Sequence, residues 1–97
     1  MLLVTQGTKM TQEIEHVYTF HTDAGHGWLE VDMLELEMLG ITDQISCYSY
    51  KHRGKAYLEE DCDASVFINA MESKGQKVAY VTSNTNYDSP IRNFARF

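Results

Sequence analysis

The stretch that decides the fold is QISCYSYKHRGKAYLEEDCDASVFINAMESK, residues 44–74 of a 97-residue chain. Polar and apolar residues alternate over residues 44–50 and again over the shorter run 56–59, a pattern typical of β-strands. The loop between these runs, residues 52–55, contains Gly54, which can adopt a positive φ. The stretch therefore predicts a β-hairpin.

A helix is expected directly after this hairpin, over residues 64–74. Its apolar residues have the i, i+3, i+4, i+7 spacing of a single helical stripe: Ala64, Phe67, Ile68 and Met71. We expect Asp61 or Asp63 to cap the start of this helix and Gly75 to end it.

On the N-terminal side, strands are expected over residues 13–21 and 27–31, joined by a turn that contains Asp23 and Gly25. Residues 1–9 are weakly patterned and are expected to form a tail.

A short helix is expected over residues 33–39. Asp32 and Glu35 have the spacing of a capping box, and Gly40 is suited to end a helix. Toward the C-terminus, a strand is expected over residues 77–82, and an extended segment is expected over residues 91–97 after a polar loop.

These elements define a fold class. From Gly27 onward their order is β-α-β-β-α-β, which is the order of a ferredoxin-like split β-α-β unit. We therefore predict one α+β domain over residues 1–97, with two helices on one face of a mainly antiparallel sheet and an extra N-terminal strand.

The charges are unevenly distributed. Eight Lys and Arg residues stand against fourteen Asp and Glu, a net charge of −6. Residues 10–50 contain no Lys or Arg and eight carboxylates: Glu13, Glu15, Asp23, Glu30, Asp32, Glu35, Glu37 and Asp43. Since nucleic-acid binding depends on cations, we expect no direct contact with nucleic acid, although the hairpin tip is basic and flanked by tyrosines.

No apolar run approaches the roughly 20 residues that a membrane span requires, and no signal peptide is visible. We therefore expect a cytoplasmic protein without membrane contact. Its two cysteines, Cys47 and Cys62, are then expected to stay reduced, with Cys47 in the core.

Catalytic chemistry has few candidates in this sequence. His21, Asp23 and His26 flank one turn and are the candidate ligands of a metal, but their spacing matches no common zinc pattern. The acidic run 59–63 lacks the spacing of a calcium loop. Because no nucleophile motif or phosphate loop is present, we expect neither a cofactor nor an enzymatic activity.

Five stretches are distinctive in combination: GHGWLEV (residues 25–31), LGITDQIS (39–46), YSY (48–50), YLEEDCDA (57–64) and an IR…RF tail (91–97). Together they resemble a family of small accessory proteins carried by phages, prophages and plasmids. The resemblance implies no catalytic residue. It implies a protein that disarms host defences by binding a protein.

The function expected from these observations is inhibition of a host protein or complex, such as a CRISPR or restriction system. The binding residues would form an acidic face with Trp28 as its anchor: Trp28, Glu30, Asp32, Glu35, Glu37 and Asp43. Trp28 can also be interpreted as a core residue. Two alternatives stay open: a small metal-dependent or histidine-assisted enzyme that uses His21, Asp23 and His26, and a homodimeric regulatory module joined through an exposed strand edge.

Overall fold

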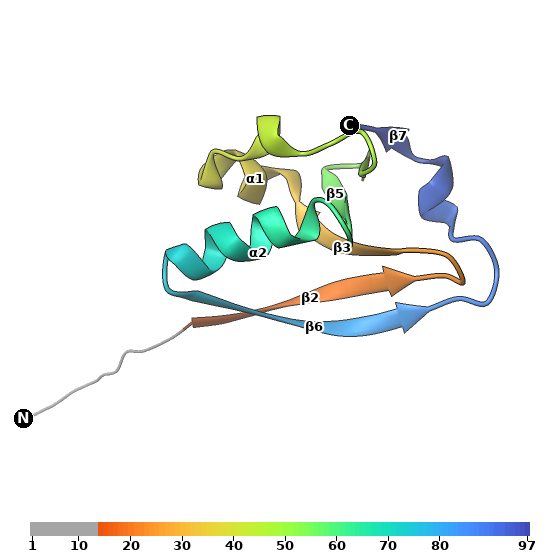
Figure 1. Cartoon of the computed structure of the whole chain (residues 1–97), viewed down its shortest axis with the longest axis horizontal. Coiled ribbons are helices and arrows are strands. Elements are labelled where there is room, and N and C mark those ends of the chain that lie inside the picture. Colours follow the sequence, from red (N-terminus) through yellow and green to blue (C-terminus); the bar gives the residue numbers. More distant parts are fainter. Residues whose placement is uncertain (1–13) are drawn as a thin grey trace, which may run out of the picture.

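The computed structural model describes residues 14–97, in which six strands form one sheet and two α-helices cover one of its faces (Figure 1). The expected tail, residues 1–9, lies outside this part of the chain. The strands are β2 (Ile14–Thr22), β3 (Gly27–Asp32), β4 (Tyr50–His52), β5 (Lys55–Glu59), β6 (Gln76–Asn84) and β7 (Ala95–Arg96). The helices are α1 (Met33–Leu39) and α2 (Ala64–Ser73), with short 3-10 turns η2 (Thr42–Gln44) and η3 (Pro90–Asn93).

The sheet has the strand order β6-β2-β3-β5-β4-β7. All neighbouring strands are antiparallel except β2 and β6, which run parallel over nine residue pairs, from Ile14 opposite Gln76 to Thr22 opposite Asn84. The predicted α+β class and mainly antiparallel sheet are therefore confirmed. The β-α-β-β-α-β order is also present, and the extra N-terminal strand β2 is inserted between β3 and β6.

The main core fills the space between the sheet and the two helices. Its buried residues include Leu29 and Val31 of β3, Leu36 of α1, and Phe67 and Met71 of α2. The predicted stripe of α2 thus faces the sheet, with Ile68 partly buried beside it.

A second, smaller cluster lies on the opposite face of the sheet, because side chains alternate along β3. Trp28, Tyr50 and Ile91 are buried there, with Tyr57 and Phe94 packed against them. This cluster attaches the C-terminal segment to the sheet.

The strand predicted over residues 44–50 is wrong. Gln44 belongs to η2, residues 45–49 are irregular, and β4 begins only at Tyr50. The side chains of Ser46 and Ser49 bind Asp63, which draws this segment toward the start of α2 instead of into the sheet. In consequence Cys47 is exposed and not a core residue.

Two further predictions also need correction, one at the start of α2 and one in the C-terminal segment. Asp63 does precede α2, but its carboxylate makes no capping bond to the helix, because it accepts hydrogen bonds from Ser46 and Ser49. The segment predicted as extended over residues 91–97 begins with η3 and is extended only at β7. Within residues 14–97, no helix is long and apolar enough to cross a bilayer.

Candidate functional site

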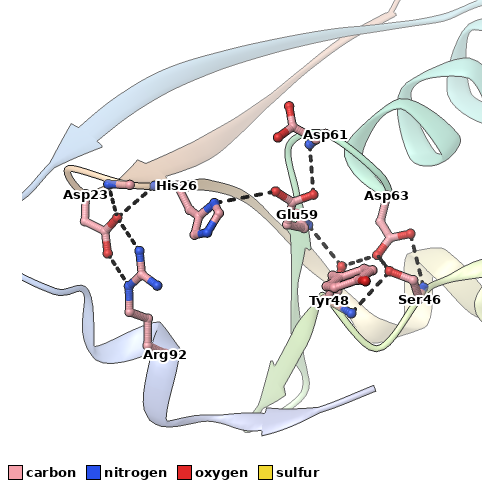
Figure 2. A network of polar contacts seen from close by, with 10 residues as sticks. Asp23, His26, Ser46, Tyr48, Glu59, Asp61, Asp63 and Arg92 are labelled. Carbon is pink, nitrogen blue, oxygen red and sulfur yellow. Dashed lines mark hydrogen bonds and ion pairs between the residues drawn. The ribbon is translucent and has the colours of Figure 1, made fainter.

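The turn between β2 and β3 is organised by the carboxylate of Asp23. Its oxygens accept hydrogen bonds from the backbone N–H groups of Gly25 (3.0 Å), His26 (2.9 Å) and Ser89 (2.9 Å). The Arg92 guanidinium adds two more, of 2.7 Å from Nε and 2.9 Å from Nη2 (Figure 2). These bonds hold the pKa of the buried Asp23 carboxyl far below its usual range, with the Arg92 bonds as the largest cause.

Two arginines of the C-terminal segment lie over aromatic rings of the second cluster. The guanidinium carbon of Arg92 is 5.3 Å from the centre of the Trp28 ring, and that of Arg96 is 5.0 Å from the centre of the Tyr50 ring. Trp28 is only 1% exposed, and its Nε1–H has no hydrogen-bond partner within the described residues. A buried, unpaired N–H of this kind leaves a donor available beside the ring.

A second polar network joins the loop before β4 to the loop before α2. Asp63 accepts hydrogen bonds from Ser46 and Ser49, and the Ser49 hydroxyl accepts one from the backbone of Glu59 at 3.0 Å. Glu59 accepts one from the backbone of Asp61 at 2.9 Å (Figure 2). The other carboxylate oxygen of Glu59 is 3.9 Å from Nδ1 of His26, so this network reaches the turn organised by Asp23.

Between the two networks lies a hollow of about 300 Å³. It is lined by His26, Trp28, Tyr48, Tyr50, Glu59, Asp61, Cys62, Arg92 and Arg96. These nine residues come from four segments of the chain, within residues 26–28, 48–50, 59–62 and 92–96.

Two groups of the hollow, Cys62 and Arg92, are altered by neighbouring carboxylates. The pKa of the Cys62 thiol is raised by desolvation, by its hydrogen bond to Glu59 and by the neighbouring carboxylates, so its nucleophilic thiolate is disfavoured. Arg92 is already neutralised by Asp23.

The candidate metal ligands do not come together. His21 is hydrogen-bonded to Glu30 at 2.7 Å, Asp23 binds Arg92, and His26 lies beside Trp28 and Glu59. Among residues 14–97 no group of three or more His, Cys, Asp or Glu side chains could hold a metal ion. The three residues stabilise different contacts of the fold.

The predicted acidic face is only partly free. Three of its carboxylates are engaged in the fold: Glu30 with His21, Asp32 with Lys55 at 2.5 Å, and Glu35 with the hydroxyl of Tyr18 at 2.7 Å. Burial and the bond to Glu35 raise the pKa of Tyr18 well above its usual range. Glu37 and Asp43 are exposed and make no side-chain hydrogen bond or ion pair within the described part of the chain.

Sequence reasoning missed two apolar residues beside these carboxylates. Leu34 and Met38 lie one turn apart on α1 and are 61% and 75% exposed. The sequence contained a signal for this exposure. Met33, Leu36 and Leu39 follow one another at three-residue spacing and form the buried side of the helix, which leaves Leu34 and Met38 on another side. Trp28, by contrast, is buried within the second cluster.

Comparison of the chain with protein-family models, with curated proteins and with solved structures finds no match.

Proposed function

We propose that this protein is a small acidic binding protein of a mobile element that inhibits a host defence protein or complex in the cytoplasm. The observation that carries the proposal is the outer surface of α1. Leu34 and Met38 are exposed apolar side chains, and Glu37, the residue before Met38, is exposed as well. With Asp43 of η2, these residues are called the α1 surface below.

The α1 surface has the composition of a protein–protein contact. Exposed apolar side chains one turn apart provide a centre that excludes water, and the surrounding carboxylates favour a basic partner. No Lys or Arg occurs in residues 10–50. A host surface that normally binds nucleic acid supplies both the positive charge and a function that occupation would block.

The test uses capture of partners from a host lysate at low and at high salt, with the wild-type chain and three variants. Glu37→Lys combined with Asp43→Lys reverses the free carboxylates. Glu35 is left unchanged, because its bonds to Tyr18 and to the backbone of Asp32 belong to the fold. Leu34→Ser combined with Met38→Ser removes the apolar centre.

The matched control is Glu15→Lys combined with Glu72→Lys. Both carboxylates are exposed and belong to other elements, β2 and α2, and their reversal changes the net charge by the same amount. We expect one host protein to bind the wild-type chain and this control in equal amounts. The charge reversal on the α1 surface should slow association about tenfold at low salt, while the apolar double variant should speed dissociation.

The captured protein is then assayed for nucleic-acid binding with and without the purified chain. Loss of that binding in the presence of the wild-type chain, and its retention with both α1 variants, is the expected result. Equal capture by the wild type and both α1 variants would remove the α1 surface from the proposal.

A further inference from the structure

The outer edge of β6 has the features of an interface with a second copy of this chain. β6 is nine residues long and lies at one end of the sheet, with β2 on its inner side and no strand of residues 14–97 on its outer side (Figure 1). An edge strand leaves about half of its backbone N–H and C=O groups available for pairing. At about 3.3 Å per residue this edge is about 30 Å long.

This edge carries few of the devices that usually protect a free edge. Charged residues, prolines and bulges block edge-to-edge pairing in monomeric sheet proteins. Residues 78–82, the centre of β6, have the sequence VAYVT and contain no charged residue and no proline. The parallel register with β2 also continues over nine pairs without a bulge. The opposite edge strand, β7, is protected by its length of only two residues.

The apolar side chains near this edge are unusually exposed. Val17 of β2 is 62% exposed, and Val81 and Tyr80 of β6 are 60% and 55% exposed. Val17 lies beside Ala79 in the sheet, and Thr19 lies beside Val81. Tyr18, Phe20 and Val78 pack on the core side of the sheet. Because side chains alternate along a strand, the two pairs Val17–Ala79 and Thr19–Val81 lie on the opposite face, which carries no helix.

We propose that two copies pair through β6 in antiparallel fashion, with the two-fold axis at Tyr80. This register places Ala79 opposite Val81 of the second copy. One row of neighbouring side chains then crosses four strands, from Val17 and Ala79 of one copy to Val81 and Thr19 of the second copy. The two-fold axis generates a second, equivalent row. Lys77 falls opposite Ser83 of the second copy, so no like charges face each other.

In this register β6 therefore pairs with a second copy of itself without placing like charges opposite each other. The area that two nine-residue edges bury is smaller than a standard interface of about 1,600 Å², so the dimer should dissociate in the micromolar range. In Figure 1 α1 and β6 lie on opposite sides of the molecule, so pairing leaves the α1 surface free.

The test is sedimentation equilibrium of the full chain from about 1 µM to 1 mM, the range in which a micromolar dimer changes its state. We expect a transition from monomer to dimer. Val81→Lys should weaken the dimer about tenfold or more, because it places two charges in the apolar rows. Leu34→Lys is the matched control, since Leu34 is equally exposed on α1 and its substitution adds the same charge.

Hydrogen exchange of the wild-type chain provides a second measurement that requires no variant. Protection of the amides in β6 should increase with protein concentration, together with the dimer fraction. The proposal is overturned by a monomer at every concentration, by a dimer that Val81→Lys leaves unchanged, or by concentration-dependent protection that falls on α1 and not on β6.

Discussion

Asp23 and Arg92 are 69 positions apart in the chain and are joined by two hydrogen bonds, of 2.7 and 2.9 Å. The Asp23 side chain is 1% exposed, whereas Arg92 is 31% exposed. A buried carboxylate of this kind is stable only while its donors are present. The pair therefore fastens the C-terminal segment onto the β2–β3 turn.

Asp23→Asn should destabilise the protein. The amide keeps the shape of the carboxylate, but its NH2 group must replace one of two accepting oxygens. Oδ1 accepts from Gly25, His26 and Arg92 Nη2, and Oδ2 accepts from Ser89 and Arg92 Nε, so the NH2 group faces N–H donors in either position. We expect the free energy of unfolding to fall by about 3 kcal/mol, measured by urea titration. A change below about 0.5 kcal/mol would show that the pair contributes little to stability.

The same residue predicts a dependence on pH. Because its folded-state pKa is depressed, Asp23 stabilises the fold above the pKa of an unfolded Asp, about 3.9, and this stabilisation is lost as the pH falls toward the folded-state value. The difference in stability between wild type and Asp23→Asn should be constant above about pH 5 and should shrink below about pH 4. A difference that grows on acidification would contradict this assignment.

Ser49→Ala should cost more stability than Ser46→Ala. Ser49 is fully buried and serves two partners, since its hydroxyl donates to Asp63 and accepts from the backbone of Glu59. Its loss leaves both groups unpaired, at a cost of about 2–3 kcal/mol. Ser46 keeps a backbone hydrogen bond to Asp63 after substitution, so about 1 kcal/mol is expected. Thermal unfolding of both variants gives the comparison, and the reverse order would contradict it.

Arg53→Asn should stabilise the hairpin between β4 and β5. Arg53 and Gly54 both have positive φ, of 50° and 80°, the requirement of a type I′ turn. Asn tolerates this conformation better than a long side chain does, and a gain of about 0.5–1 kcal/mol is expected. Arg53→Lys is the control and should give no gain, because the strain at Cβ is unchanged.

Cys62 should react slowly with iodoacetamide at pH 8 despite its exposure. Its pKa is raised by desolvation, by the hydrogen bond to Glu59 and by the carboxylates of Asp63 and Asp61, so less thiolate is present. In a Cys47→Ala background, mass spectrometry should show alkylation several-fold slower than that of free cysteine. Asp61→Asn should increase the rate, and an unchanged rate would remove that carboxylate as a cause.

The elements that the sequence predicted well depend on near neighbours. α1 has the predicted bounds, because its capping box and Gly40 are local signals, and Gly40 ends the helix with a positive φ of 71°. α2 ends within one residue of its predicted limit, since its apolar stripe and Gly75 are local as well. Local geometry also explains the two-residue turn at Arg53 and Gly54.

The errors concern residues whose partners are distant. Residues 45–49 alternate like a strand, but Ser46 and Ser49 bind Asp63, 17 and 14 positions away. Hydrophobic periodicity indicates which side chains of a segment share a face. It contains no information about a hydrogen-bond partner elsewhere in the chain.

The sequence by itself determined the α+β class, the positions of both helices, the place of the turn at Gly54 and the acidic character of residues 10–50. The hairpin around that turn differs from the prediction, because its first strand is Tyr50–His52 and its loop has two residues instead of four. Only the tertiary structure decided that β2 is inserted beside β6, that Asp23 binds Arg92, and that Trp28 is buried while Leu34 and Met38 are exposed. The physical reason is that turns, caps and stripes depend on residues within one or two turns of each other. Strand order, ion pairs and side-chain exposure depend instead on which segments, distant in the sequence, pack against each other and exclude water.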